Sequence, residues 1–285
     1  MDGFLIVNKP KGITSQTVCN VIKKKLNTKK VGHNGTLDPN ATGVMLVAVG
    51  NATKLLKLFN EHDKEYIARI IFGYDSKSLD MESKLTTDIN MDVSIDSIKR
   101  ALDKELERAE QIPPIISAIK VNGKKLYQYD LENKEIDIKP REVKLFNYEI
   151  ISDLMDFNSH KEIDIKINVS KGYYVRSLAR DLGASLGGCA ILHELKRTKT
   201  GDFKIEDAID LDDITENSLI SIFDFLKLPV VDLDSYMKKL VLNGVELDER
   251  NTTTRGIFYV RINCDIMAIY EEVSPQKYKP ILIFK

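Results

Sequence analysis

Residues 163–169 alternate strictly between branched apolar and polar side chains. The apolar positions are Ile163, Ile165, Ile167 and Val169, and the polar ones are Asp164, Lys166 and Asn168. Successive side chains of a strand point to opposite faces of a sheet, so this pattern predicts a half-buried strand. After residues 170–172, Leu178, Leu182 and Leu186 recur at the spacing of one helical face. The segment therefore predicts a strand, a turn and a helix in succession.

The rest of the chain mixes strand and helix patterns without a regular order. Apolar or alternating runs at 4–7, 44–49 and 66–72 predict further strands. Ser15 and Ser94 can each cap a helix, because both precede apolar residues at helical spacing. No strand–helix–strand unit repeats, so we expect an α+β protein.

The sequence changes in character after about Leu228. Three short strand-like pieces follow, at 256–262, 266–270 and 280–284, separated by polar, turn-like stretches. We therefore expect two domains, a larger one over residues 1–228 and a small β-rich one over residues 229–285.

Composition and motifs exclude several classes of protein. The longest apolar run, residues 44–49, is too short to cross a bilayer, and we expect no signal peptide, because no basic stretch precedes a long apolar one. The three cysteines and four histidines are scattered, so neither a disulfide framework nor a metal site is expected. This cysteine usage fits a reducing cytoplasm, where we expect the protein to be located.

Positive charge is concentrated at the start of the chain. Residues 1–60 carry nine lysines against two acids, a sum of +7, although the whole chain has a net charge of −1. Residues 202–250 carry thirteen acids against five bases, a sum of −8. A basic N-terminal face is what contact with phosphate groups requires. A solvated helix face rich in lysine explains the same charges, and charge alone leaves both interpretations open.

Residues 32–43 form a glycine-rich segment that contains one carboxylate, that of Asp38. Glycine permits a tight backbone and the close approach of a ligand. Pro39 restrains the residue before it to an extended conformation, which fixes the direction of the Asp38 side chain. A carboxylate held in this way can act as a nucleophile. An ordinary turn has the same composition, so the segment by itself leaves both interpretations open.

A second segment places aromatic and basic side chains where the predicted strand ends and the helix begins. Tyr173 and Tyr174 are adjacent, and Arg176 follows. Aromatic faces can stack on an unpaired base, and an arginine can pair with a phosphate or a carboxylate. Core tyrosines at a helix start are the simpler interpretation, and Tyr66, taken alone, is also typical of a core residue.

Taken together and in order, these segments resemble the TruB family of tRNA pseudouridine synthases over residues 4–215. The most specific match is the Gly-Thr-Leu-Asp-Pro core at residues 35–39. The matching segments are 8–15, 32–43, 50–54, 64–66, 113–127, 170–176, 181–183, 195–197 and 201–203.

The resemblance implies a pseudouridine synthase fold, α+β around a mixed and mainly antiparallel sheet. It also implies a small PUA-like RNA-binding domain at the end of the chain. The substrate would be uridine 55 in the T loop of tRNA, recognised largely through tRNA shape and backbone. Family precedent favours a monomer that needs neither a metal nor an organic cofactor.

The resemblance also assigns roles by matching position. Asp38 falls on the catalytic aspartate, Tyr66 on the tyrosine that stacks on the target base, and Arg176 on the arginine that pairs with the aspartate. Residues that line the pocket or contact flipped nucleotides are matched by His33, Tyr174 and Leu195. Turning a base out of a folded loop costs a few kcal/mol, and stacking on an aromatic ring can offset about 1–3 kcal/mol of it. A nearby arginine would keep Asp38 ionised.

The chain departs from the usual family pattern at a few positions. Asn34 stands where threonine is usual, a polar exchange that should keep a turn, and Tyr173 stands in place of another threonine. Lys77 replaces an aspartate in the segment 76–80, although Asp80 is kept. Asp130 and Leu131 stand where Ala-Arg is common, which removes a positive charge. None of these positions is Asp38, Tyr66 or Arg176.

Two other functions remain in competition at this point. A non-catalytic RNA-binding protein or tRNA folding factor would need the basic face and the aromatic residues, but not Asp38. A glycosidase would need two carboxylates that face each other, whereas residues 32–43 supply one, with an arginine as its expected partner.

Overall fold

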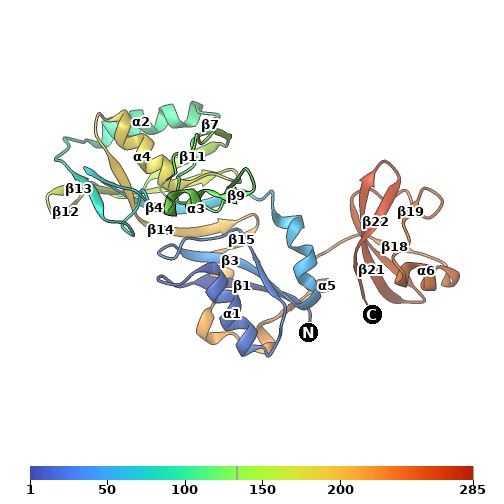
Figure 1. Ribbon diagram of the computed structural model, residues 1–285. Coiled ribbons are helices and arrows are strands. Elements are labelled where there is room, and N and C mark those ends of the chain that lie inside the picture. Colours follow the sequence, from blue (N-terminus) through green and yellow to red (C-terminus); the bar gives the residue numbers. More distant parts are fainter. Residues whose placement is uncertain (133, 285) are drawn as a thin grey trace.

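The computed structural model describes residues 1–132 and 134–284, and its centre is one large mixed sheet (Figure 1). Along the sheet the strands follow the order β11-β13-β4-β14-β3-β1-β16. Neighbours run antiparallel except for two parallel pairs, β14 with β3 and β1 with β16. The sheet therefore confirms the expected α+β class with a mixed, mainly antiparallel sheet.

The strands of this sheet differ widely in length. Those along its path are β11 (Leu145–Ile150), β13 (His160–Val169), β4 (Lys64–Phe72), β14 (Ala190–Thr200), β3 (Thr42–Val49), β1 (Gly3–Lys9) and β16 (Ile209–Asp210). Four short strands pair beside this path: β2 (Val31–Asn34), β12 (Met155–Phe157), β15 (Phe203–Lys204) and β17 (Ile220–Ser221). The strand predicted at 163–169 is confirmed, because buried and half-buried positions alternate along β13.

Helices cover the sheet at two places. The helices α1 (Ser15–Lys25) and η1 (Gly50–Phe59) lie by β1 to β3, and α2 (Ile95–Glu107) and α4 (Val175–Ser185) lie by β4, β11 and β13. The predicted cap of α2 at Ser94 is confirmed. The predicted cap of α1 at Ser15 is wrong: Thr14 caps α1 by accepting a hydrogen bond from the backbone N–H of Thr17, and Ser15 is buried inside the first turn.

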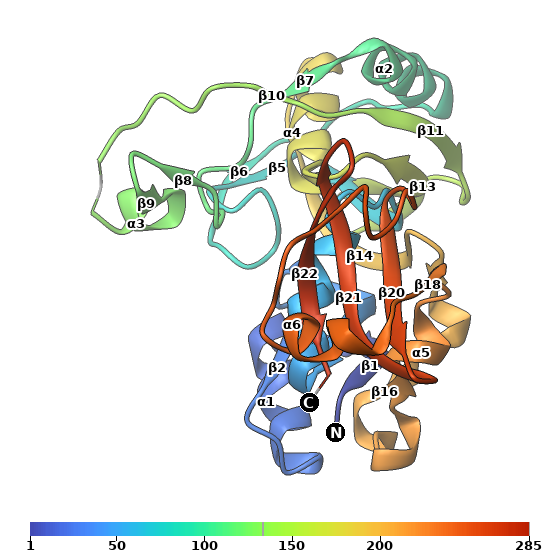
Figure 2. The ribbon, with the colours of Figure 1, turned by 90° about the vertical axis from the view of Figure 1, so that its right-hand side faces the viewer.

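Two excursions leave the sheet near its β4–β13 half. The first is a hairpin of β5 (Tyr74–Ser76) and β6 (Leu85–Asp88), called the hairpin below. The second is the arm, residues 112–140, whose base is the pairing of β7 (Glu110–Gln111) with β10 (Arg141–Glu142). The arm contains β8 (Lys120–Val121), β9 (Lys124–Lys125) and α3 (Leu126–Leu131), and it extends away from the sheet at the left of Figure 2.

A second, five-stranded sheet ends the chain and has a core of its own. Its strands are β18 (Val230–Asp232), β20 (Ile257–Ile262), β21 (Asp265–Ser274), β22 (Lys277–Ile283) and β19 (Leu247–Asp248), with the helix α6 (Lys238–Leu242) beside them. It packs on the large sheet through η1 and α5 (Ile222–Phe225). The three strands predicted between 256 and 284 are confirmed.

Short 3₁₀ turns connect the remaining elements. They are η2 (Ile205–Asp207), η3 (Leu211–Asp213), η4 (Glu216–Ser218) and η5 (Ser235–Met237). None of the helices in the described part of the chain is long and apolar enough to cross a membrane.

Candidate active site

Asp38 lies in a short loop between two antiparallel neighbours, β2 and β3. The loop is shorter than the segment predicted from the sequence. Residues 32–34 belong to β2, residues 42–43 belong to β3, and only 35–41 connect them. Asn34, expected in a turn, ends β2 instead, where the side-chain amide of Asn34 donates hydrogen bonds to the carbonyl of Leu56 and the side chain of Asn60.

Buried polar groups from the N-terminal segment hold this loop in place. The Nζ atom of Lys9, on a side chain with no exposed surface, donates to the carbonyls of Pro39 at 2.9 Å and Ala41 at 2.7 Å. The hydroxyl of Ser15 accepts from the Leu37 N–H at 2.9 Å and donates to the Leu37 carbonyl at 3.0 Å. Burial lowers the pKa of Lys9 to about 8. The backbone on both sides of Asp38 is therefore held in place by hydrogen bonds from buried side chains.

Arg197 ties the loop to the centre of the sheet. Its buried guanidinium donates to the carbonyls of Val44 at 2.7 Å and Gly35 at 3.0 Å. Gly43 is at φ +110°, and a Cβ atom there would overlap the Arg197 backbone, so this contact requires glycine. Sequence reasoning missed Arg197 and Lys9 as supports of the site, because their only signal was membership of matching segments.

Arg176 faces Asp38 from the start of α4. The strand, turn and helix predicted for residues 163–186 place Arg176 in the first turn of this helix. The Nε atom of Arg176 lies 3.0 Å from an Asp38 carboxylate oxygen and 3.8 Å from one of Asp80. The two Nη atoms donate to the carbonyl of Ser78 at 3.0 Å and that of Ile116 at 3.2 Å. One guanidinium thus contacts the Asp38 loop, the hairpin and the arm.

The environment of Asp38 combines an open side and an enclosed side. Its side chain is 41% exposed, because it faces a cavity, yet protein surrounds it elsewhere. Burial raises the pKa of the Asp38 carboxyl, and the Arg176 guanidinium opposes this while the Asp80 carboxylate adds to it. The result is a partly enclosed carboxylate beside a fixed cation, which is an arrangement that suits a nucleophile.

The cavity in front of Asp38 has a volume of about 580 Å³. Its lining contains five of the six site residues predicted from the sequence: Asp38, Tyr66, Tyr174, Arg176 and Leu195. The sixth, His33, lies on β2 and is not part of the lining, although its neighbour Asn34 is. Burial, and then the charge of Arg197, lower the pKa of His33.

Part of the wall of this cavity comes from the arm. Ser117, Ala118 and Ile119 line the cavity there, together with Tyr174. The backbone N–H of Tyr174 donates to the side-chain oxygen of Gln111 at 2.9 Å, which joins α4 to the base of the arm.

A second carboxylate, that of Asp80, lies 3.8 Å from the Nε atom of Arg176 and does not line the larger cavity. It is buried, and it accepts hydrogen bonds from the Ser78 hydroxyl and from the Glu82 N–H. Asp80 and Asp38 both line a smaller cavity of about 120 Å³. Asp38 thus shares the larger cavity with Glu142 and the smaller one with Asp80 and Glu82, and what sets the site apart from the two acids of a glycosidase is the ion pair of Asp38 with Arg176.

Two of the departures noted in the sequence meet in space. The Nζ atom of Lys77 lies 2.8 Å from an Asp130 carboxylate oxygen, so a residue of the hairpin pairs with one of the arm. Tyr173, another departure, packs against the core around α2 and α4 while also reaching the rim of the cavity.

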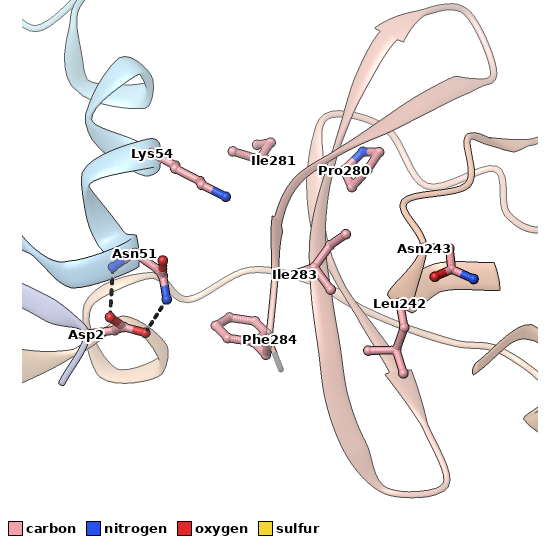
Figure 3. A pocket seen from close by; sticks show the side chains of 9 residues that line it. All are labelled: Asp2, Asn51, Lys54, Leu242, Asn243, Pro280, Ile281, Ile283 and Phe284. Atoms are coloured by element: carbon pink, nitrogen blue, oxygen red, sulfur yellow. Dashed lines mark hydrogen bonds between the residues drawn. The ribbon is translucent and has the colours of Figure 1, made fainter. Parts of the chain in front are cut away.

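A larger cavity of about 690 Å³ lies between η1 and the C-terminal sheet (Figure 3). Asp2 fixes Asn51 there through hydrogen bonds of 2.7 and 3.0 Å, and Lys54 extends toward Ile281. None of the predicted site residues lines it. In the described part of the chain, no three histidine, cysteine or acidic side chains are grouped so as to hold a metal ion.

The sequence matches known family models over most of the large sheet. A model described as "TruB family pseudouridylate synthase (N terminal domain)" matches residues 23–175, more than half of the chain. The chain belongs to the TruB family. A second model, "tRNA pseudouridylate synthase B C-terminal domain", matches residues 176–224 of this TruB-family chain. In the structure those residues include α4 and β14, so they are part of the large sheet.

Full-length relatives share the family name. The chain is 38% identical to "tRNA pseudouridine synthase B" of Aster yellows witches'-broom phytoplasma (strain AYWB), over all of both chains. It is also 38% identical, over all of both chains, to the protein of that name from Acholeplasma laidlawii (strain PG-8A). A 37% identical relative with the same name, from Borreliella burgdorferi (strain ZS7), matches over 99% of each chain.

Solved structures share the fold at lower identity. A chain of "Crystal Structure of a Cbf5-Nop10-Gar1 Complex" aligns with a TM-score of 0.66 at 24% identity, covering 99% of this chain and 84% of that one. A chain of "Structure of H/ACA RNP bound to a substrate RNA containing 2'-deoxyuridine" gives 0.64 at 24% identity, covering 99% and 83%. These matches show the pseudouridine synthase fold for this TruB-family chain.

Proposed function

We propose that this chain isomerises uridine 55 in the T loop of tRNA to pseudouridine, with Asp38 as the nucleophile. The observation that carries the proposal is the ion pair of Asp38 and Arg176 at one wall of a cavity that Tyr66 also lines. Family membership and the relatives named tRNA pseudouridine synthase B support the same substrate and reaction.

The reaction exchanges one bond to the sugar for another. The bond from N1 of uracil to C1′ breaks, the detached base turns, and C5 bonds to C1′, while a proton leaves C5 and another joins N1. Asp38 forms a transient covalent bond with the nucleoside during this exchange, which divides one difficult step into two easier ones. The base must first leave the folded loop, since no enzyme group reaches it inside the stack.

The neighbouring side chains have distinct roles in this proposal. Arg176 keeps Asp38 ionised and directs it, because a fixed cation at 3.0 Å favours the carboxylate. Tyr66 stacks on the flipped uracil, and Tyr174 and Leu195 form the rest of its pocket. His33, outside the lining of this cavity, contacts a nucleotide beside the target.

The proposal extends to domains, partner and location. Residues 1–228 form the catalytic domain, and residues 229–285 form a PUA-like domain that contacts RNA away from the pocket. The partner is the T stem-loop of tRNA, bound by a monomer in the cytoplasm, where tRNA is matured. Binding RNA alone does not require a carboxylate held against a cation at the wall of a cavity, so this ion pair favours the catalytic function.

Site-resolved mapping of pseudouridine on unmodified tRNA tests the function directly. Incubation with the purified protein should convert position 55 and leave the other uridines of the transcript unchanged. Mass spectrometry of nuclease fragments, before and after incubation, gives the readout. Conversion only at another position would contradict the T-loop assignment, and no conversion in any tRNA would contradict the activity.

Affinity for tRNA is expected to fall as salt rises. Of the lysines in residues 1–60, Lys9 is buried and Lys57 pairs with Glu271, but Lys24, Lys29 and Lys30 are exposed. Each lysine that neutralises a phosphate adds about −0.9 to the slope of log K against log salt. Filter binding from 50 to 300 mM KCl measures this slope, and replacing Lys24, Lys29 and Lys30 by glutamine should make it less steep. An unchanged slope would show that RNA docks elsewhere.

A further inference from the structure

The arm is attached to the rest of the molecule mainly at its base. Near that base, the Ser177 hydroxyl and the Arg176 guanidinium donate to the carbonyls of Ile112 at 2.9 Å and Ile116 at 3.2 Å. Farther along, the described hydrogen bonds join parts of the arm to one another, such as the Tyr127 N–H to the Ser117 carbonyl at 3.2 Å. The far part of the arm therefore depends on few contacts for its position.

One of those contacts is the ion pair between Lys77 and Asp130. Beyond Ser117, among the described residues, it is the one hydrogen bond or ion pair that links the arm to another element. The Asp130 side chain is 14% exposed and the Lys77 side chain 53% exposed, so the carboxylate is partly shielded from water. Partial shielding strengthens a pair that would contribute little if both groups were fully solvated.

The hairpin presents Lys77 from a stiff turn. The hydroxyl of Ser76 donates to the Asp80 carbonyl at 2.6 Å, and the hydroxyl of Ser78 donates to the Asp80 carboxylate. The carbonyl of Ser78, next to Lys77, accepts the Arg176 guanidinium. The hairpin is thus held in place by its own hydrogen bonds and by Arg176. Because Lys77 belongs to this rigid hairpin, its ion pair with Asp130 restricts the movement of the arm.

The position of the arm matters for the cavity, since Ser117, Ala118 and Ile119 form part of its lining. We propose that the ion pair of Lys77 and Asp130 latches the arm beside the Asp38 cavity, so that both are positioning residues for the RNA. Neither touches the reacting atoms, because neither lines the cavity. The kinetic part of this inference rests on the proposed function, whereas the effect on the arm does not.

Charge reversal separates a latch from a general effect of charge on RNA binding. Lys77→Asp removes positive charge and Asp130→Lys adds it, so an effect of net charge alone would move KM for tRNA in opposite directions. A latch requires both single variants to raise KM, by about 3- to 10-fold, because each places like charges face to face. The double variant keeps the net charge and restores an ion pair, so its KM should be within about twofold of the original.

Hydrogen exchange in the free protein tests the latch without any RNA. The amides of Leu126 and Tyr127 donate to carbonyls elsewhere in the arm, those of Ile119 and Ser117. We expect both amides to exchange about 3- to 10-fold faster in either single variant. The double variant should return them to the original rate, and 1 M NaCl should speed them in the original protein. Amides of β4 and β13 should be unchanged, which shows that the fold is intact.

A matched control comes from an ion pair remote from the cavity. Lys161 and Asp156, at 2.6 Å, join β13 to β12, and Lys161→Asp should change neither arm exchange nor KM. Unchanged exchange in both single variants would overturn the latch, as would opposite shifts in KM or a double variant that fails to recover. An inactive protein with the expected exchange pattern would instead contradict the proposed function and leave the latch supported.

Discussion

Asp38→Asn should abolish pseudouridine formation, with a loss of at least about 10⁴-fold in the single-turnover rate. The amide has the size of the carboxylate but is a far weaker nucleophile, so the covalent step cannot occur. Contacts of the loop through Lys9 and Ser15 do not involve the Asp38 side chain and should remain. Mapping of the T loop after incubation, at enzyme in excess over tRNA, measures the loss.

The stability of the same variant provides the control. Burial raises the pKa of Asp38 in the folded state, so the folded protein holds this proton more tightly than the unfolded chain does. The stability that Asp38 contributes is therefore greatest at low pH and is lost as pH rises through its raised pKa. At pH 7 the thermal midpoint of Asp38→Asn should be equal to or above the original, with tRNA binding retained. Full activity in this variant would contradict the nucleophile assignment.

Arg176→Lys should lower the single-turnover rate by about 10²- to 10³-fold. Lysine keeps the positive charge but cannot hold Asp38 while also donating to the carbonyls of Ser78 and Ile116, which the planar guanidinium does. The carboxylate then loses its direction as well as part of its stabilisation. Rapid-quench measurement of pseudouridine formation at saturating enzyme gives the rate.

The pH dependence of Arg176→Lys tests the electrostatic part of this role. Activity requires ionised Asp38, so the rate should rise with pH through the pKa of this carboxyl. A lysine that holds Asp38 less closely stabilises the carboxylate less. The pKa of Asp38 then rises further, because burial and Asp80 already act in that direction. The acid limb of the rate profile should therefore move to higher pH in the variant. A rate loss with an unmoved acid limb would mean that Arg176 orients Asp38 without affecting its charge.

Local sequence patterns predicted those elements whose cause is local. The alternation in residues 163–169 predicted β13, and the strand, turn and helix that follow place Arg176 at the start of α4. The proline after Asp38 and the glycines around it indicated a loop with one directed carboxylate. The side chains that one face of a strand buries and the geometry of a tight loop both depend on residues close together in the chain. Such features can therefore be predicted from the sequence.

Contacts between distant segments could not be predicted in this way. Ser15 has the composition of a helix cap, yet tertiary packing buries it against Leu37, and Thr14 takes the cap instead. Arg197 reaches the loop because β14 pairs with β3, which places Arg197 opposite Gly43. Lys77 and Asp130 are 53 positions apart, and only the folded chain shows that they meet. Each of these three contacts depends on the topology of the fold, which cannot be read from a single sequence.

The small sheet at the end of the chain shares apolar contacts with the large one. Phe4 and Leu46 belong to the same buried cluster as Tyr259 and Ile269, and the Tyr259 hydroxyl donates to the carbonyl of Leu226 at 3.0 Å. A joint built from a continuous apolar cluster resists swinging, unlike two domains on a tether. Under the proposed function, the span between the reacting uridine and the second contact on the RNA is then constant. An RNA stem longer or shorter than this span would contact either the Asp38 cavity or the C-terminal sheet, but not both. The protein would therefore select RNA by the length of its stem.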